Sequence, residues 1–403
     1  SAWVAPRVFE NLAEYNDQSD AKGNPRLTSV INKGDIEMCE GFLLGYGRLG
    51  LWGVQIALEN AEGEDFVAAF YDPLNALPLY EWSNIAVSFD SATGYIGLFY
   101  NGEVSYEAVI PELQGTRIIS SEQPLYIGKY CSPMVEYGVK RQMISGLLDE
   151  VRVYAKSLSP KEARENYGAF AKDGHPSLDF SEIALDSSVY AGDRYRPQYH
   201  AIPPAVWMNE PHSPFYYKGR YHVFYQHGPT LEVPREPMHW GHAVSGDLTH
   251  WETLAPALYP DGNDDGCFSG SALVWQDKLW LLYTSFTENG GGENIRQRQA
   301  LAVSEDGVHF EKLGVVIGEN DLPEGYSPCD FRDPKMWEKD DAFYCVVAAK
   351  KIGGKGRILL YTSDDLKKWR FVGDLFGKDS KGEMIECPDY IEDKGLLLCC
   401  EQF

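Results

Sequence analysis

The sequence predicts an all-β protein in which a β-sandwich is followed by a β-propeller. The first part shows short apolar runs with strand-like alternation, and the second part repeats itself. The segments SGDLTHW, SEDGVHF and SDDLKKW begin 59 residues apart, at Ser245, Ser304 and Ser363. Equal spacing of units that each hold several short strands is typical of a β-propeller, where each repeat forms one blade.

The first part reads as an antiparallel sandwich. Asn101-Gly102 predicts a hairpin, because a type I′ turn needs a positive φ at both central positions. Ser159, Pro160 and Glu162 predict a helix N-terminus with a capping box, and this helix would close the sandwich. Strand-like runs cover residues 52–58, 64–72, 82–90, 94–100 and 147–155.

These patterns divide the chain into a sandwich with its closing helix over 1–171, a polar linker over 172–195 and a propeller over 196–403. Such a sandwich either binds glycans or braces the next domain, and nothing in 1–157 identifies a sugar site. In the propeller, an apolar run precedes each repeat, and the SxD segment predicts a turn whose following aromatic ring packs between blades. Apolar runs lie at 221–226, 279–285, 342–349 and 395–400, which predicts three blades and the beginning of a fourth.

Composition excludes several classes of function. The net charge of −24 argues against a nucleic-acid or anionic-membrane partner. No apolar run approaches the ~20 residues that a membrane-spanning helix needs. The 8 cysteines lack metal-ligand spacing and favour reduced thiols. The start, SAWVAPRVFE, has no signal segment, which favours a cytoplasmic protein over a secreted one unless the N-terminus is clipped.

Three carboxylates lie in conspicuous surroundings: Glu210 in WMNEPH, Asp333 in FRDP and Glu386 in IECPDY. Glycoside hydrolysis needs a carboxylic acid paired with a carboxylate nucleophile or base. The order, spacing and neighbours of the three resemble glycoside hydrolase family 32, which comprises invertases, inulinases, levanases and related fructosyltransferases. The resemblance covers roughly residues 195–403 and implies a five-bladed propeller, so we expect this chain to be truncated in blade four. Residues 30–157 resemble laminin-G-like, concanavalin-type sandwiches.

The resemblance implies a catalytic role for each carboxylate. Glu386 would be the general acid/base, and Asp333 would hold the fructose hydroxyls and stabilise the transition state. Glu210 stands where the family has an Asp nucleophile. Its extra methylene would move the carboxylate by roughly 1 Å, a misplacement that can cost ~100-fold in rate. The alternatives are a structural Glu in a non-catalytic homologue and an engineered change.

The resemblance also implies a fructose pocket, but it does not decide which leaving sugar the site accepts. The loop between Gln226 and Trp240 has no aromatic residue where many members of the family carry a Trp, which allows a leaving sugar other than that of sucrose. Trp240 itself is expected to be a packing residue. The implied substrate-binding residues are Asn209, Gln226, Trp207, Phe268, Ser269 and Arg332.

No metal or cofactor is predicted, since DGNDDG at 261–266 lacks calcium-loop spacing and reads as a blade turn. Three functions fit the sequence, all with a fructose-containing oligo- or polysaccharide as partner. The leading one is a retaining β-fructofuranosidase acting on sucrose, fructo-oligosaccharides or fructans. The others are a fructosyltransferase with the same site and a glycan-binding protein without catalysis. Free fructose as product would indicate hydrolysis, whereas oligosaccharide or dianhydride would indicate transfer.

Overall fold

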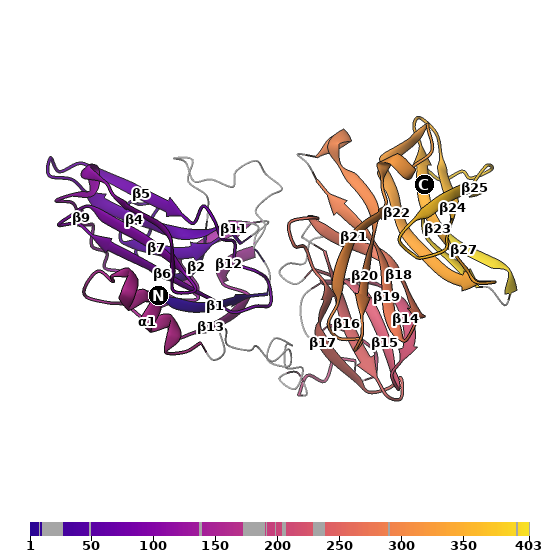
Figure 1. Cartoon of the computed structure of the whole chain (residues 1–403), viewed down its shortest axis with the longest axis horizontal. Helices are drawn as coiled ribbons and strands as arrows, with labels where there is room; N and C mark the ends of the chain where they lie inside the picture. Colours follow the sequence, from indigo (N-terminus) through magenta and orange to yellow (C-terminus); the bar gives the residue numbers. More distant parts are fainter. Residues whose placement is uncertain are drawn as a thin grey trace. The chain divides into compact units, whose positions relative to one another are not determined.

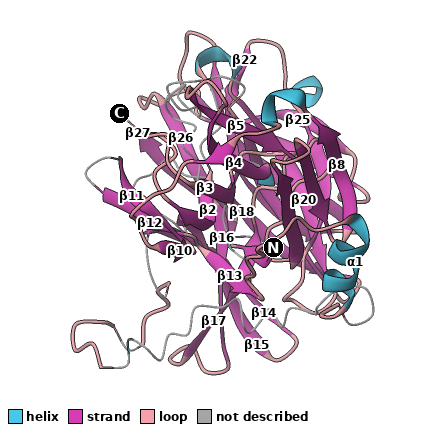
Figure 2. Cartoon of the chain, turned by 90° about the vertical axis from the view of Figure 1, so that its left-hand side faces the viewer, coloured by secondary structure: helices cyan, strands magenta, loops and turns pink. Residues whose placement is uncertain are grey.

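A computed structural model of the chain describes residues 1–7, 9, 27–47, 50–136, 139–171, 190, 192–197, 199–203, 207–228, 238–288, 291–391 and 394–402. Strands make up nearly all of the regular structure (Figure 2), so the all-β prediction is confirmed. The chain divides into two compact units, Ser1–Ile183 and Ala184–Phe403 (Figure 1). No helix in the described part of the chain is both long and apolar enough to span a membrane.

The first unit contains two antiparallel sheets that bury a shared core with Val4, Trp52, Ile85 and Leu98. The first sheet has the order β13 (Gly146–Asp149), β1 (Ala2–Pro6), β6 (Ser83–Asp90), β7 (Tyr95–Tyr100) and β8 (Glu103–Val109). The second has the order β10 (Leu125–Ile127), β2 (Thr28–Lys33), β3 (Phe42–Tyr46), β4 (Trp52–Glu59) and β5 (Asp65–Tyr71), with β9 (Arg117–Ile118) beside β4. Strands β11 (Lys129–Glu136) and β12 (Val139–Met143) form a separate hairpin.

The predicted hairpin and helix of this unit are confirmed. Asn101 and Gly102 have φ values of 49° and 80° and join β7 to β8. Helix α1 (Pro160–Gly168) begins with the capping box of Ser159 and Glu162. It packs close to the hairpin, because a Cβ atom on Gly102 would lie 2.8 Å from the Cβ of Tyr167.

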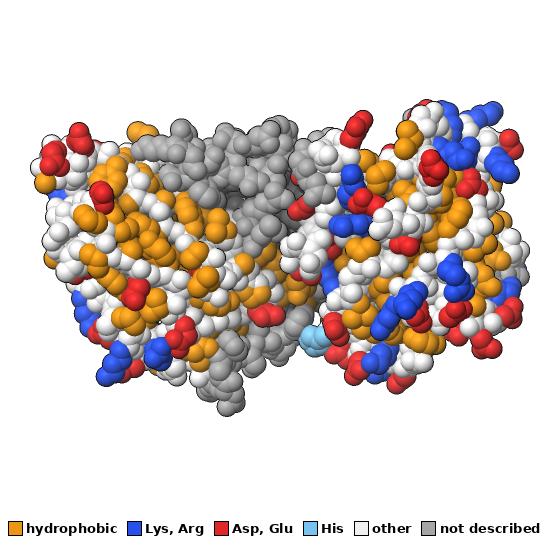
Figure 3. Space-filling view, turned by 45° about the horizontal axis from the view of Figure 1, so that its top comes forward, with side chains coloured by type: hydrophobic (Ala, Val, Ile, Leu, Met, Phe, Trp, Pro, Cys, Tyr) orange, Lys and Arg blue, Asp and Glu red, His pale blue; other side chains and the backbone are white. Residues whose placement is uncertain are grey.

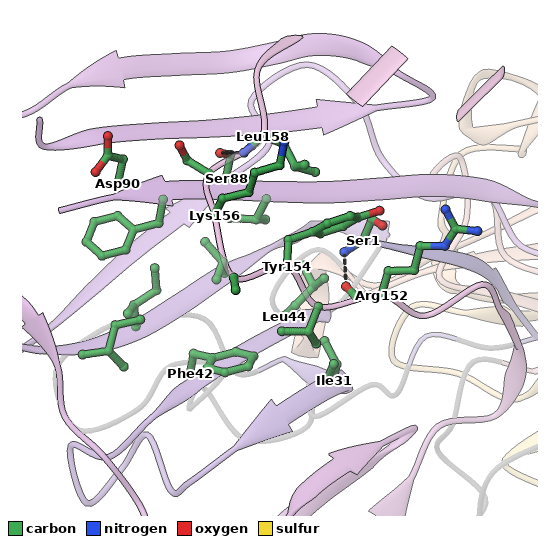
Figure 4. Close-up of a pocket in the computed structure, with 18 of the residues that line it drawn as sticks. Ser1, Ile31, Phe42, Leu44, Ser88, Asp90, Arg152, Tyr154, Lys156 and Leu158 are labelled. Carbon is green, nitrogen blue, oxygen red and sulfur yellow. Dashed lines mark hydrogen bonds between the residues drawn. The ribbon is translucent and has the colours of Figure 1, made fainter. Parts of the chain in front are cut away.

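Two expectations about the sandwich need correction. The run 147–155 is a strand only as far as Asp149, because Glu150 has a φ of 48° and this left-handed conformation interrupts the extended backbone. Residues 151–155 continue without strand structure over a pocket of about 450 Å³ between the sheets, whose wall includes Phe42 and Leu44 (Figure 4). The resemblance to concanavalin-type sandwiches, which we bounded at residue 30, also extends to earlier residues, since β1 pairs with β13 and β6.

The described residues of the second unit form four antiparallel sheets, in the places where the repeats predict them. Three have four strands, and the described part of the last has two; the number of blades in the whole propeller stays a prediction. Their orders are β14 (Trp207–Tyr217), β15 (Arg220–Gly228), β16 (His239–Ser245) and β17 (Trp251–Leu258); β18 (Gly266–Trp275), β19 (Lys278–Thr287), β20 (Arg296–Ser304) and β21 (Glu311–Ile317); β22 (Tyr326–Lys339), β23 (Ala342–Lys351), β24 (Gly356–Ser363) and β25 (Trp369–Phe376); and β26 (Met384–Ile391) with β27 (Leu396–Gln402). Short 3₁₀ helices are η2 (Pro111–Leu113) in the first unit and η4 (Gly292–Asn294) and η5 (Glu319–Asp321) in the second.

The predicted SxD turns join the third and fourth strands of each four-stranded sheet. In each turn the aspartate, Asp247, Asp306 or Asp365, accepts hydrogen bonds from two backbone N–H groups. The aromatic residue that follows packs between sheets, as predicted, in two of the repeats. Phe310 contacts Phe224 of the preceding sheet, and Trp369 lies in one core with Trp280.

Candidate active site

The three predicted carboxylates lie on the first strands of three sheets. Glu210 is on β14, Asp333 on β22 and Glu386 on β26. The first strands contact one another in series, β14 with β18, β18 with β22 and β22 with β26. None of the three carboxylates is therefore on an outer strand, and the topology brings their strands side by side.

Each of these first strands carries a bulge next to a predicted site residue. A β-bulge places an extra residue on one strand and re-aims the side chains around it. Such irregularities are common beside active sites, where a side chain must leave the regular alternation of the strand. The pairing shifts between Met208 and Pro211 on β14, Phe268 and Gly270 on β18, Arg332 and Lys335 on β22, and Glu386 and Asp389 on β26.

Two residues at these bulges have left-handed backbones. Asp333 has a φ of 61° and Cys387 a φ of 49°. Aspartate tolerates this region better than most residues, whereas cysteine does so at a cost. The conformation brings the Cys387 N–H to the Asp333 carboxylate, where it donates to Oδ2 at 2.9 Å. The strained backbone of Cys387 therefore coincides with a hydrogen bond between the FRDP and IECPDY motifs.

A chain of hydrogen bonds fixes the backbone of Asp333. Its N–H donates to the Thr284 hydroxyl at 2.9 Å, and that hydroxyl donates to Gln299 Oε1 at 3.0 Å. Gln299 Nε2 in turn donates to the carbonyl of Phe331 at 2.8 Å. No sequence motif includes Thr284 or Gln299, whose one signal is a polar side chain within a strand-like stretch.

The Asp333 carboxyl is buried, with 8% of the residue exposed. Burial raises its pKa from the ordinary value of 3.8 to about 6, and the Cys387 N–H and Arg332 partly oppose this rise. The charges of Glu386 and Glu210 raise the pKa of Asp333 further. Because both charges act on one buried carboxyl, the three predicted residues form a single electrostatic cluster.

Glu386 is held from both sides. Arg332 donates to Glu386 Oε1 from Nε at 3.0 Å and from Nη2 at 2.7 Å, and Gln402 Nε2 donates to Oε2. Arg332 also donates from Nη1 to Gln297 Oε1 at 3.3 Å. Burial lowers the pKa of the Arg332 guanidinium, but the neighbouring Asp333 and Glu386 carboxylates outweigh this effect and raise it overall. Gln402 and Gln297 are further contacts that the motifs did not reveal.

The side chain of Glu210 is fixed by the neighbouring sheet. Ser269, on the bulge of β18, donates a hydrogen bond from Oγ to Glu210 Oε1. The ring of the adjacent Phe268 stacks on Phe286 with centroids 4.6 Å apart. Glu210, Ser269 and Phe268 are thus brought together as the resemblance implies.

The other predicted residues surround this cluster more loosely. Gln226 is buried, and its Nε2 donates to the carbonyl of Cys267 at 3.1 Å, one residue before Phe268. Trp207 and Asn209 precede Glu210 on β14, the first half-buried and the second exposed. Trp240 is fully buried and donates from Nε1 to the Phe268 carbonyl at 2.8 Å, which agrees with the expected packing role.

The segment 261–266 connects β17 to β18 and contains a buried ion pair. Asp264 accepts from Lys312 Nζ at 2.9 and 3.1 Å and from the Tyr283 hydroxyl at 3.0 Å. Asp264 therefore has a structural role in this segment, since it is the buried partner of Lys312 and Tyr283. Within the described residues, no group of three His, Cys, Asp or Glu side chains is arranged to hold a metal ion. The aromatic-free loop between Gln226 and Trp240 lies mostly outside the described residues, over 229–237.

Comparisons with protein families assign both parts of the chain. Residues 200–395 match the model of the glycosyl hydrolases family 32 N-terminal domain. Residues 1–164 match that of the concanavalin A-like lectin/glucanases superfamily. Both resemblances predicted from the sequence are confirmed, and with them the order of sandwich and propeller.

Several curated relatives each align with about half of this chain. A sucrose-6-phosphate hydrolase of Escherichia coli is 46% identical over 205 residues, which are 49% of this chain and 42% of the relative. A levanase of Bacillus subtilis is 42% identical over 229 residues, 54% of this chain and 32% of the relative. A Bombyx mori family 32 β-fructofuranosidase, solved as a mutant with sucrose, aligns with a TM-score of 0.47 and 41% identity over 53% of this chain and 45% of that one. This chain spans less than half the length of each of these relatives.

Proposed function

We propose that this chain, whose residues 200–395 match the N-terminal domain of glycosyl hydrolases family 32, is part of a retaining glycoside hydrolase that releases β-fructosyl units from sucrose, fructo-oligosaccharides or fructans. The observation that carries the proposal is the cluster of Glu210, Asp333 and Glu386, three carboxylates on the first strands of separate sheets, where the charges of Glu210 and Glu386 both act on Asp333. The relatives named sucrose-6-phosphate hydrolase, raffinose invertase and levanase support the substrate class.

In the proposed reaction, a Glu210 oxygen attacks the anomeric carbon of the fructosyl unit. Glu386 protonates the glycosidic oxygen at the same time, so that the leaving sugar departs as a neutral alcohol. Glu386, now ionised, then takes a proton from water. The resulting hydroxide displaces Glu210 from the fructosyl unit and releases fructose.

The hydrogen bond from Ser269 supports Glu210 as the nucleophile in place of the family's Asp. It anchors one carboxylate oxygen, Oε1, and leaves Oε2 for the attack. A longer side chain loses more conformational freedom when it is fixed, and a fixed geometry within a fraction of an ångström is what rapid attack requires. Ser269 is therefore a positioning residue in this proposal.

Asp333 would contact the substrate without forming a covalent bond. With a pKa of about 6, it is mostly ionised at neutral pH although it is buried. An ionised carboxylate accepts strong hydrogen bonds from sugar hydroxyls and stabilises the positive charge that develops on the fructosyl ring. Arg332 would hold Glu386 in place between the two steps.

The test compares Glu210→Gln and Glu386→Ala with the wild type on sucrose, kestose, inulin and levan, with products separated by ion chromatography. Glu210→Gln should lower turnover by several orders of magnitude, because no covalent intermediate can form. Glu386→Ala should do the same on these sugars but retain activity on a fructoside whose leaving group needs no proton. Glu311→Gln is the matched control, since Glu311 is an exposed glutamate on the outer strand β21.

Three results would decide against parts of this proposal. An active wild type unaffected by Glu210→Gln would move the nucleophile to another carboxylate. Oligosaccharide products in place of fructose would indicate a transferase. An inert wild type that gains activity from Glu210→Asp would indicate a binding protein whose nucleophile position no longer works.

A further inference from the structure

The bulge of β22 that carries Asp333 depends on hydrogen bonds from outside its own sheet. Among the described strands, β22 pairs on one edge only, with β23. This ladder skips Asp333 and Pro334, because its register shifts between Arg332 and Lys335. A buried backbone N–H without a ladder partner needs another acceptor. The strands β18, β19 and β20 of the second sheet all contact β22 and can supply one.

The face of the second sheet that meets β22 is mostly apolar. Charged side chains are common on the surface of the second unit drawn in Figure 3. On this inner face, in contrast, Leu282 and Leu301 are buried and share one core with Phe331 and Met336 of β22. A polar side chain in such surroundings costs free energy unless it is hydrogen-bonded. Polar residues on this face therefore need specific partners.

Three neutral polar side chains lie on this face. Thr284 on β19 is two residues from Leu282, so both side chains point to the same side of the sheet. Gln299 pairs with Thr284 and Ser271 pairs with Leu282 across the strands, which places them on that side as well. Each of the three polar residues is at most 2% exposed.

Thr284 and Gln299 form a closed loop of hydrogen bonds with β22. The Asp333 N–H donates to the Thr284 hydroxyl at 2.9 Å, which donates to Gln299 Oε1 at 3.0 Å. Gln299 Nε2 returns to β22 and donates to the Phe331 carbonyl at 2.8 Å. A backbone N–H can only donate and a carbonyl can only accept, so the loop has one possible direction. This direction fixes the Thr284 proton and the orientation of the Gln299 amide.

Ser271 holds β22 on the other side of the bulge, where the Met336 N–H donates to its Oγ at 2.9 Å. The second sheet therefore holds β22 before, at and after the bulge. Within this frame Asp333 keeps its φ of 61°, and its carboxylate accepts from the Cys387 N–H of the fourth sheet at 2.9 Å. An extended backbone at Asp333 would restore the regular alternation of β22 and re-aim the carboxylate.

We propose that Thr284 and Gln299 are positioning residues, which hold the bulge of β22 and thereby aim the Asp333 carboxylate at the fructosyl unit. The inference rests on the proposed function, in which Asp333 stabilises the positive charge that develops on that unit. A carboxylate displaced by ~1 Å can still accept a hydrogen bond from a bound sugar, but it stabilises the transition state less. The loss of Thr284 or Gln299 should therefore lower kcat more than it raises KM.

The main experiment measures kcat and KM of Thr284→Val and Thr284→Ser on the sugar that the wild type cleaves fastest. Thr284→Val removes the acceptor of the Asp333 N–H, so kcat should fall by about 10- to 100-fold. KM should change by less than about 3-fold, because ground-state binding is largely kept. Thr284→Ser retains the hydroxyl and should keep kcat within about 3-fold of the wild type.

Gln299→Met tests the second member of the loop. It leaves the Thr284 hydroxyl on the Asp333 N–H but removes the acceptor that orients it, so kcat should fall less than in Thr284→Val. This milder variant decides the matter if Thr284→Val does not fold, and an unchanged kcat would then refute the inference. The double variant should be no slower than Thr284→Val alone, within about 3-fold, because both residues act through one chain.

Thr362→Val is the matched control. Thr362 is a strand threonine of the third sheet, and its hydroxyl donates to the Phe343 carbonyl at 3.0 Å within that sheet. The substitution removes a hydrogen bond of a threonine hydroxyl without affecting the bulge, so kcat and KM should stay at the wild-type values. Urea unfolding of each variant establishes that it is folded at the assay temperature.

The outcomes separate this inference from the proposed function. A wild-type kcat in Thr284→Val, a loss confined to KM, a fall that Thr284→Ser shares or losses that multiply in the double variant would overturn the inference and leave the hydrolase intact. If the wild type cleaves no fructoside, the proposed function fails, and calorimetry with fructose decides the inference. Fructose binding that is weakened by Thr284→Val but not by Thr284→Ser or Thr362→Val supports it. Equal binding to all four proteins, or no binding, refutes it.

Discussion

Asp333→Asn should make the protein more stable at alkaline pH while it abolishes activity. Asp333 is buried, and its pKa rises from an ordinary 3.8 to about 6 on folding. A carboxyl with a raised folded-state pKa contributes stability that is fully present below about pH 4 and is lost as the pH rises through 6. The ionised Asp333 side chain thus lowers the free energy of unfolding at pH 8.

The size of this cost follows from the pKa shift. A rise from 3.8 to about 6 corresponds to about 3 kcal/mol at pH 8, where the carboxyl is ionised in both states. Asparagine removes the charge, tolerates the φ of 61°, and retains an oxygen that accepts from the Cys387 N–H. Because the charge-assisted part of that hydrogen bond is lost, we expect a net gain of about 1–3 kcal/mol.

Urea unfolding of wild type and Asp333→Asn at pH 8, 6 and 4 measures this effect. The first unit is identical in both proteins, so the difference between them reports on the second unit. The gain should shrink from pH 8 to pH 4. Asp365→Asn is a control of opposite sign, because backbone N–H groups lower the pKa of Asp365 and its charge stabilises a turn. A gain independent of pH, or a less stable Asp333→Asn at pH 8, would refute the reasoning.

Three further predictions concern stability. Lys312→Met should destabilise the protein by about 3–5 kcal/mol in urea unfolding, since it leaves Asp264 buried and unpaired; a loss below about 1 kcal/mol would contradict the ion pair. Ser159→Ala should cost about 1 kcal/mol and lower Tm by about 2–4 °C through loss of the cap, whereas an unchanged Tm would argue against it. Gly102→Ala should cost about 1–3 kcal/mol, because the new Cβ would meet Tyr167 in a left-handed turn; an unchanged unfolding curve would show that the turn relaxes.

Local signals in the sequence were sufficient for the repeated elements. The 59-residue spacing predicted the positions of the SxD turns. These turns could be predicted from local sequence because the Asp of each turn accepts hydrogen bonds from backbone N–H groups of the same turn. The hairpin at Asn101 and the helix that begins after Ser159 were predictable for the same reason. The run 147–155 was partly wrong, since no sequence pattern announces the left-handed φ of Glu150.

The candidate site likewise contains residues that the sequence motifs predict and residues that only the folded structure reveals. The motifs named Glu210, Asp333 and Glu386, and the order of the sheets explains why they lie on neighbouring first strands. The motifs did not include Thr284 and Gln402, which hold Asp333 and Glu386 from other strands, 49 and 16 residues away in the sequence. Which side chains become hydrogen-bond partners of the carboxylates depends on which strands lie next to each other, and this is decided only when the sheets form and pack.

The sequence by itself therefore determined the all-β class and the repeat and predicted the three candidate carboxylates, because alternation, spacing and residue type are properties of short segments. Tertiary structure alone decided the bulges that aim those carboxylates and the burial that raises the pKa of Asp333. Each of these depends on contacts between residues on different strands. Burial and electrostatic interaction act through space, so they appear only when the chain has folded.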